Sequence, residues 1–287
     1  MLQGNDAIQQ PAQEAVYLYC ITGESTGEYP AGLGTRGVDP ANPVYSIPYR
    51  NLRAVVSKVP LDEFGEEALR TRLEDMDWIR TKGMLHERVI RQVMSKCTVI
   101  PMRFATIYRD DRRIREILAE NYSNFSGILL WLEGKEEWGV KIYYRLQAME
   151  EHVIRFSPQV GDLKQKIAVA SGGQAYLLKK KLSKTVQEEI DRLLFAHAEQ
   201  CYGRLKKLAV SSCTNDLLDK KVTGKDVDMI LNAAYLVEQQ KINEFLSEVI
   251  RLQKDYPYLE FDYSGPWPAY NFCTVSGKGS DEHARAK

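Results

Sequence analysis

The chain has 287 residues, of which 44% are hydrophobic and 27% charged, a composition typical of a globular protein that buries a sizeable core. Lysine and arginine together number 39, as do aspartate and glutamate, so the formal net charge is +0. This balance argues against non-specific electrostatic binding to nucleic acid or to an anionic membrane. The sequence contains no run of about 18 apolar residues, so no membrane-spanning helix is predicted.

The first half of the sequence alternates strand-like and helical patterns. Residues 1–15 are polar and aperiodic, which predicts a disordered tail without the features of a secretion signal. Residues 16–150 are predicted to form an N-terminal ferredoxin-like α+β domain, with a Gly- and Pro-rich loop over residues 22–43. Strands are predicted at residues 16–21, 44–47, 53–59, 99–108 and 140–144, and helices at residues 75–96 and from Asp110 through Tyr122.

The second half begins after a polar stretch, residues 151–172, that is predicted to be a linker. A C-terminal α+β domain is predicted over residues 173–275, followed by a disordered tail over residues 276–287. Its opening helix, residues 172–208, would reach about 50 Å, so we expect it either to be broken or to project and offer a packing face to a partner. Strands are predicted at residues 208–213, 229–237 and 258–263, and a helix from Ile242 to the residue before Pro257.

The predicted fold class is therefore α+β. It consists of two ferredoxin-like α/β-sandwich domains with mainly antiparallel sheets. The second domain is expected to contain the long helix.

Side chains that usually carry catalysis are few and scattered. The five cysteines show no Cys-x-x-Cys spacing, and none of the four histidines has a second histidine one helical turn away. His86, followed by Glu87, lies beside the apolar stripe of a predicted helix, and we interpret it as a structural, hydrogen-bonded histidine. No glycine-rich phosphate loop and no Gly-x-Ser-x-Gly motif occurs. We therefore predict that the chain is not an enzyme and holds no cofactor or metal.

The densest basic run is Lys179, Lys180 and Lys181 with Lys184. An acidic or nucleic-acid contact would suit it, but we interpret it as a solvated helix face in which Lys184 pairs with Glu188 one turn on. No interleaved aromatic platform accompanies the run, which disfavours nucleic-acid binding. The 16 tyrosines and four tryptophans of the chain suit either protein contacts or ordinary sheet surfaces.

Several segments carry distinctive motifs in a fixed order along nearly the whole chain. The most distinctive are Pro101-Met102-Arg103-Phe104, in a predicted strand, and Gly265-Pro266-Trp267-Pro268, close to the predicted C-terminal tail. Taken together, the segments resemble the gas vesicle L/F (GvpL/GvpF) family. The segments are residues 17–21, 49–57, 86–90, 99–106, 134–141, 173–181 and 265–272.

This resemblance implies a cytoplasmic accessory protein or minor structural component of gas vesicles, the hollow protein shells that give some prokaryotes buoyancy. It implies binding to the hydrophobic shell subunit and to other minor vesicle proteins, and it offers no catalytic residues. An open sheet edge or the apolar stripe of the long helix could receive the shell subunit. The motif residues that we expect to be structural or partner-facing are His86, Glu87, Pro101, Arg103, Phe104, Gly265, Pro266, Trp267 and Pro268.

Two alternative functions stay open, an enzyme or small-molecule sensor and an RNA-binding module, the second of which the charge balance disfavours. An enzyme or small-molecule sensor on ferredoxin-like domains would require a deep pocket around His86, Glu87 and Arg103. The two prolines around Trp267 favour a chain crossing whose indole fills a gap between domains, in preference to a direct partner contact.

Overall fold

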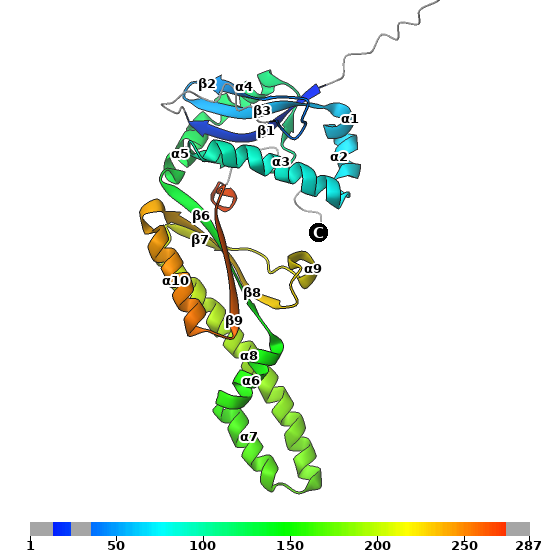
Figure 1. Ribbon diagram of the computed structural model, residues 1–287, viewed down its shortest axis with the longest axis vertical. Helices are drawn as coiled ribbons and strands as arrows, with labels where there is room; N and C mark the ends of the chain where they lie inside the picture. The colour runs from blue at the N-terminus through cyan, green and yellow to red at the C-terminus, as the bar shows by residue number, and fades with distance from the viewer. Residues whose placement is uncertain (1–13, 24–35, 274–287) are drawn as a thin grey trace, which may run out of the picture. The chain divides into compact units, whose positions relative to one another are not determined.

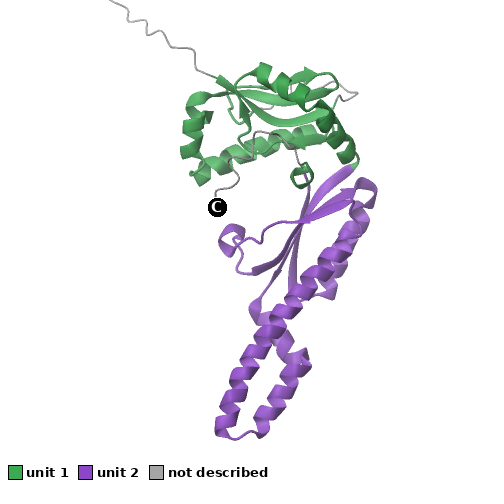
Figure 2. Ribbon diagram, turned by 180° about the vertical axis from the view of Figure 1, so that it is seen from behind, with its two compact units in different colours: residues 1–134, 268–287 green, residues 135–267 purple. Residues whose placement is uncertain are grey.

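Backbone pairing gathers the strands into two antiparallel sheets, one in each of two compact units (Figures 1 and 2). The computed structural model describes residues 14–23 and 36–273. Unit 1 comprises residues 1–134 and 268–287, and unit 2 comprises residues 135–267. The predicted α+β fold with two mainly antiparallel sheets is therefore confirmed.

Unit 1 is a five-stranded sheet with helices packed against both faces. Its sheet has the order β2-β3-β1-β4, and β5 also pairs with β1. Its strands are β1 (Glu14–Gly23), β2 (Val44–Tyr49), β3 (Leu52–Pro60), β4 (Val99–Pro101) and β5 (Ile107–Tyr108). Its helices are α1 (Leu61–Phe64), α2 (Glu66–Arg72), α3 (Met76–Met94), α4 (Asp111–Glu120), α5 (Tyr122–Leu132) and the 3-10 turn η2 (Tyr270–Phe272).

The continuous apolar sequence of β1 matches its burial on both faces of the sheet. Tyr17 and Tyr19 point into a core that contains Val89 of α3. Val16 and Leu18, on the opposite face, belong to a core that also contains buried residues of α4 and α5. A single central strand therefore holds both layers of unit 1 together.

Aspartate side chains cap the starts of two helices in unit 1, α3 and α4. The Asp75 carboxylate accepts hydrogen bonds from the backbone N–H groups of Asp77 and Trp78, at 3.0 and 3.1 Å, and so begins α3.

Two expectations for the secondary structure of unit 1 differ from the structure. The predicted strand over residues 99–108 is two short strands separated by a turn. The predicted helix from Asp110 ends at Glu120, where the side-chain amide and the backbone N–H of Asn121 both donate to the Ile117 carbonyl at 3.0 Å.

Unit 2 is a four-stranded sheet in the order β7-β8-β6-β9, with the connectivity of a ferredoxin-like fold. Helices cover one face, where Ile190 and Leu194 pack with Tyr235 and Phe245. Its strands are β6 (Lys135–Tyr144), β7 (Ser211–Thr214), β8 (Asp228–Glu238) and β9 (Leu259–Trp267). Its helices are α6 (Leu146–Phe156), α7 (Pro158–Val169), α8 (Gly172–Lys206), α9 (Lys220–Thr223), α10 (Ile242–Asp255) and the 3-10 turn η1 (Gln239–Lys241).

The division between the units differs from the expected domain boundaries at residues 150 and 173. The predicted strand over residues 140–144, assigned to the first domain, is part of β6, which pairs with β8 and β9 in the second sheet. The predicted linker over residues 151–172 is occupied largely by α6 and α7. The physical reason is that strand pairing is non-local, so a strand's pattern predicts its existence but not the sheet that it joins.

The long helix α8 is continuous over 35 residues. Its C-terminal half carries the residues that pack on the second sheet, whereas α6 and α7 pack against it as helix neighbours. Among the described helices, none combines the length and the apolar character needed to cross a membrane. The predicted tail over residues 276–287, most of the tail over residues 1–15 and part of the loop over residues 22–43 lie outside the described residues.

A glycine allows β9 to pass close to Trp138 of β6. A Cβ atom added to Gly265 would lie 2.8 and 2.9 Å from two atoms of the Trp138 ring and 3.0 Å from the Glu137 carbonyl oxygen. These separations are shorter than carbon contacts in a packed protein. Gly203, on α8, would meet nothing within 4 Å outside its own helix backbone. The first residue of the Gly-Pro-Trp-Pro motif is therefore needed for close packing.

We expect Gly265→Ala to lower the free energy of unfolding of unit 2 by about 1–3 kcal/mol, because the added methyl group must displace the Trp138 ring or the strand. Gly203→Ala is the matched control, and it should raise the free energy of unfolding by up to about 1 kcal/mol because it replaces glycine inside a helix. Urea unfolding read by hydrogen exchange in β6 peptides measures both. A Gly265→Ala variant as stable as the wild type would contradict the packing argument.

Candidate functional site

The nine motif residues singled out from the sequence fall into two groups. His86, Glu87, Pro101, Arg103 and Phe104 lie in unit 1, on α3 and in the segment from β4 to β5. Gly265, Pro266 and Trp267 end β9 in unit 2, and Pro268 is the first residue of the segment that returns to unit 1.

His86 is the centre of a buried hydrogen-bond network in unit 1. Its side chain is 3% exposed. The Tyr17 hydroxyl lies 3.0 Å from Nδ1, and the Met102 carbonyl oxygen lies 3.2 Å from Nε2. The Tyr270 hydroxyl is also 3.2 Å from Nε2 and donates to the Glu87 carboxylate at 3.3 Å. Four of the sequence motifs are thus joined at one imidazole ring.

The partners of His86 define its protonation. The Tyr17 hydroxyl accepts the backbone N–H of Ala105 at 2.9 Å, so its own proton is free to be donated to Nδ1. Nε2 then carries the ring proton and donates it to the Met102 carbonyl. Burial lowers the pKa of His86 from 6.5 to about 4, against the opposing effect of the Met102 carbonyl. His86 is therefore a neutral, satisfied, structural histidine near neutral pH.

The Pro-Met-Arg-Phe segment shapes the wall of this network. Its carbonyl at Arg103 accepts the backbone N–H of Thr106 at 3.2 Å, which closes a turn in which Ala105 has φ 61. The Phe104 ring packs edge-on against Trp78 and His86, with ring centroids 5.8 and 5.9 Å apart. Phe104 and Pro101 therefore have packing roles, since Pro101 is buried in β4, whereas the Arg103 side chain is exposed.

Next to His86, a second polar cluster fixes the loop that precedes β2. The Tyr19 hydroxyl lies 2.8 Å from Ser57 Oγ and accepts the backbone N–H of Val38 at 2.8 Å. Lys82 Nζ donates to the Val38 carbonyl at 3.0 Å and pairs with Glu63 at 2.8 Å. The Tyr19 and Lys82 side chains hydrogen-bond to the backbone of Val38, so the cluster has a structural role.

In unit 2 the Gly-Pro-Trp-Pro motif ends the edge strand β9. Trp267 Nε1 donates to Ser264 Oγ at 2.9 Å, and the Gly265-Pro266 peptide bond is cis. Pro266 is exposed, whereas Pro268 is buried. The indole of Trp267 therefore has a partner on its own strand.

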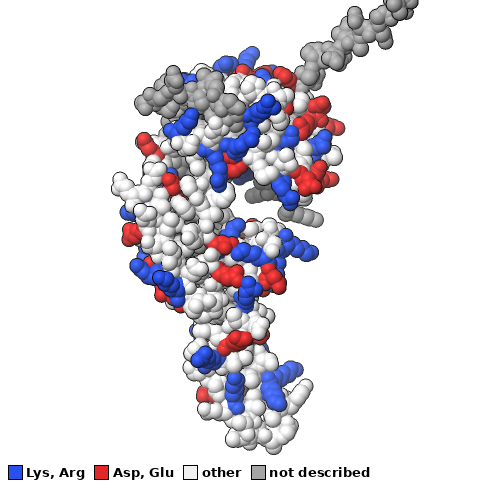
Figure 3. Space-filling model, in the orientation of Figure 1, with Lys and Arg blue, Asp and Glu red and all other residues white. Residues whose placement is uncertain are grey.

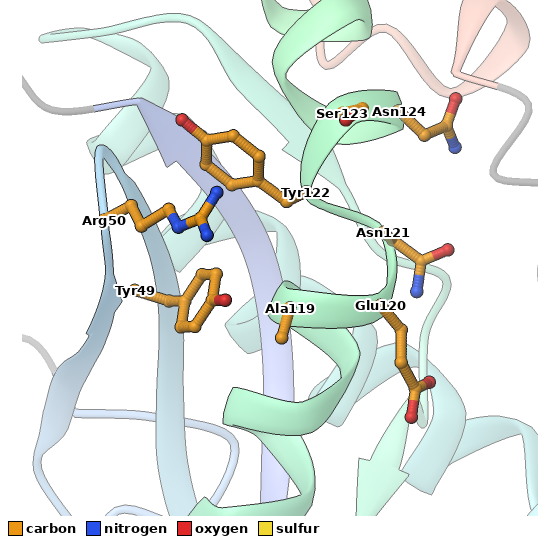
Figure 4. Close-up of a pocket in the computed structure, with 8 residues that line it drawn as sticks. All are labelled: Tyr49, Arg50, Ala119, Glu120, Asn121, Tyr122, Ser123 and Asn124. Carbon is orange, nitrogen blue, oxygen red and sulfur yellow. The ribbon is translucent and has the colours of Figure 1, made fainter.

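A hollow of about 420 Å³ lies at the turn between β2 and β3, beside the junction of α4 and α5 (Figure 4). The Arg50 guanidinium carbon lies 5.5 Å from the Tyr49 ring centroid and 4.8 Å from that of Tyr122. The Arg50 backbone has φ 53, a region that residues other than glycine seldom adopt. The lining residues are Tyr49, Arg50, Ala119, Glu120, Asn121, Tyr122, Ser123 and Asn124.

This hollow offers hydrogen-bond donors and a held cation, but its lining includes no histidine to activate Ser123. Glu120 is already paired with Arg113 at 3.0 Å. Residues 49–57 were one of the segments that carry the family resemblance, but no role was predicted for Arg50. The second ring, Tyr122, is too distant in sequence to form a recognisable local pattern with Arg50.

Side chains that could bind a metal ion are dispersed over the residues that the structure describes. No group of three or more His, Cys, Asp and Glu side chains there could hold a metal ion. The described cysteines are free thiols, and burial raises the pKa of the Cys20 and Cys201 thiols, which opposes thiolate formation. The Cys20 and Cys201 thiols therefore stay protonated near neutral pH.

The chain was compared with known proteins. The family model of the gas vesicle synthesis protein GvpL/GvpF matches residues 15–274. Gas vesicle protein L of Streptomyces sp. (strain CB03234) is 27% identical over 270 residues, covering 94% of this chain and 97% of that protein. Gas vesicle protein F of the same strain is 26% identical over 263 residues, covering 90% and 99%. Relatives of the L and F types therefore match over nearly the same length.

Solved structures give the same fold. The crystal structure of GvpF from Anabaena sp. PCC7120 has a TM-score of 0.69 at 18% identity, covering 92% of this chain and all of that one. GvpF from Microcystis aeruginosa has a TM-score of 0.61 at 20% identity, covering 91% and 99%. At these identities the likeness concerns the fold.

The buried state of His86 predicts a pH-dependent stability of unit 1. Between pH 6.5 and about 4 the unfolded chain binds a proton at His86 that the folded chain does not bind, so the free energy of unfolding falls as the pH falls. The loss across this window should reach about 3 kcal/mol. Urea unfolding read by hydrogen exchange in α3 peptides measures it, and His86→Gln should flatten the slope. Equal slopes in the two proteins would show that His86 is not responsible.

The network also predicts unequal roles for two tyrosines. Tyr17→Phe leaves the Ala105 N–H and His86 Nδ1 without their buried partner and should cost about 1–3 kcal/mol of unfolding free energy. Tyr270→Phe removes a hydroxyl from an exposed residue and should cost less than about 1 kcal/mol. Thermal unfolding of both variants tests the ranking, and a reversed order would show that the network is not centred on Tyr17.

Proposed function

Because the chain belongs to the gas vesicle synthesis protein GvpL/GvpF family, we propose that it is an accessory or minor structural protein of gas vesicle assembly. In this role it binds the hydrophobic shell subunit and other minor vesicle proteins, and it acts in the cytoplasm and at the gas vesicle. The observation that carries the proposal is the family match over residues 15–274, which includes both units.

The chemistry of the described residues supports an interaction protein rather than an enzyme. The alternative of an enzyme or sensor required an accessible pocket around His86, Glu87 and Arg103. His86 is instead buried, and both ring nitrogens have partners within the chain. The hollow beside Arg50 is lined by other residues. No observation therefore favours the alternative.

Two surfaces of unit 2 are suited to a partner. β9 is an edge strand that pairs with β6 on one side, so its other edge can accept a strand from another protein. The long helix α8 was the second expected surface. The apolar stripe of its C-terminal half, including Ile190, Leu194 and Leu205, packs in the core of unit 2. The C-terminal half leaves one large apolar side chain exposed, that of Phe195, and the N-terminal half has no fully buried side chain, so both halves keep surface for a partner.

A physical role follows from this arrangement. A subunit that exposes apolar surface before assembly aggregates, and a protein that covers this surface keeps the subunit soluble until it is added to the shell. Apolar contacts of this kind persist at high salt, whereas contacts between exposed charges weaken.

We expect co-expression with the shell subunit to increase the soluble fraction of that subunit, measured by sedimentation of cell extracts. A pull-down with the purified protein should retain the shell subunit, or a minor vesicle protein, through a salt series. An unrelated protein of similar size, expressed at the same level, is the control. If the solubility of the shell subunit is unchanged and no vesicle protein is retained, the proposed function is wrong.

A further inference from the structure

A helical hairpin extends from the core of unit 2. It consists of α7 and the N-terminal half of α8, joined by a short connection at residues 170–171 (Figure 1). The first buried residue of α8 is Glu189, so the half of the helix that precedes it contributes no fully buried side chain. Half-buried Ile167, Leu178 and Leu182 lie in this part of the hairpin. Leu182 packs against the core of unit 2, and the hairpin extends beyond it to the connection at residues 170–171.

The end of the hairpin carries an apolar group that we call the crown: Val169, Tyr176 and Leu177. Their exposed fractions are 86%, 70% and 66%. A single exposed apolar side chain on a protein surface is ordinary. Here three occur within nine residues on both sides of one connection, on ordered helices. Such a group is costly to keep in water and marks a contact site when it is enclosed by polar residues.

Lysines form a collar below the crown. Residues 158–184 contain six lysines and a single carboxylate, Asp162, although the whole chain has a net charge of +0. In the view of Figure 3, blue side chains lie along the hairpin and its end is white. Among the described residues, Lys184 alone of the collar forms an ion pair, with Glu188 at 3.4 Å. The collar consists of Lys164, Lys166, Lys179, Lys180, Lys181 and Lys184.

The spacing places the collar around the hairpin rather than along one side. Consecutive residues on a helix are about 100° apart, so Lys179, Lys180 and Lys181 point in three different directions. They lie about 10 Å along the helix from its first residue, at 1.5 Å per residue. The predicted pairing of Lys184 with Glu188 is confirmed and these lysines are exposed, but they cover more than one face of the helix. With an apolar end and positive charge around the helices next to it, the hairpin is suited to contact a partner through its end.

We infer that the hairpin end is a docking element for a partner protein whose surface has an apolar recess bordered by carboxylates. The crown enters the recess, and the collar pairs with the carboxylates. This inference rests on the proposed function, because the partner would be a gas vesicle protein. Charge complementarity determines the chemistry of the partner, since a hairpin with five excess positive charges is repelled by a basic surface.

The backbone at the hairpin end favours a protein over a lipid bilayer. α8 begins at Gly172 without a side-chain cap from Ser171 and without an acidic residue in its first turn. Its first N–H groups have no carbonyl of the same helix to bind. Hydrocarbon could not satisfy these groups if the crown entered a membrane. A recess bordered by carboxylates can accept their hydrogen bonds, and the helix dipole favours the negative charge there.

Two variants of the full-length chain test the docking element. The crown variant is Tyr176→Ser with Leu177→Ser, and the collar variant is Lys180→Glu with Lys181→Glu. All four side chains are exposed, so the fold should be kept, which circular dichroism and thermal unfolding verify. The matched controls are Leu130→Ser with Val222→Ser for the crown and Lys207→Glu with Lys254→Glu for the collar, at exposed positions elsewhere.

The probes are the purified shell subunit, each minor vesicle protein, and vesicles of phosphatidylcholine with and without phosphatidylglycerol. We expect the wild type and both controls to bind one vesicle protein. The crown and collar variants should bind the same protein with an affinity lower by at least roughly tenfold. The collar variant should also reduce the salt dependence of binding, because it removes charge pairs.

The remaining outcomes separate the inference from the proposed function. Unchanged affinity of both variants for a vesicle protein that the wild type binds would overturn the docking element and leave the proposed function standing. Crown-dependent binding to anionic vesicles, without such binding to a protein, would show that the occupant is a membrane surface and overturn the inference. A wild type that binds no vesicle protein would overturn the proposed function, and the inference with it.

Discussion

Each unit depends on one central strand that must satisfy its backbone hydrogen bonds on both sides. β1 pairs with β3 on one side and with β4 and β5 on the other, and β6 pairs with β8 and β9. β1 is buried on both faces, so unit 1 needs helices in two layers. In unit 2, α8 and α10 contribute to the principal core on one face of the sheet. The length of α8 beyond that core creates the hairpin with its exposed crown.

Many helices and strands could be predicted from local sequence patterns, because burial and helix capping depend on residues that are close together in the sequence. The apolar run from Val16 to Ile21 predicts a strand buried on both faces, and the Asp75 cap marks the start of α3. Sheet membership could not be predicted in this way. β6 was expected in the first domain, since nothing in its sequence reports that its partners lie about 90 and 120 residues later. The polar stretch taken for a linker contains two helices whose partly apolar faces pack on α8.

The candidate site shows the same limit. His86 could be interpreted as a satisfied structural histidine from its place on an amphipathic helix. Its partners Tyr17, Met102 and Tyr270 could not be named, because they come from three segments that only the fold brings together. Arg50 was missed for a similar reason, since one of its two rings comes from α5. Four of the motif segments in this chain meet at His86, so the segments that carry the resemblance also build one buried network.

The chain leaves unit 1 at Gly134 and returns to it at Pro268, so that unit 2 is an insertion within unit 1. Tyr270, on the returning segment, contacts His86, 184 residues earlier in the sequence. During synthesis, therefore, all of unit 2 is made before unit 1 receives the Tyr270 hydroxyl. The N-terminal sheet can form early, but the network around His86 closes only when unit 2 has been made. A product truncated before Tyr270 would lack this contact with His86.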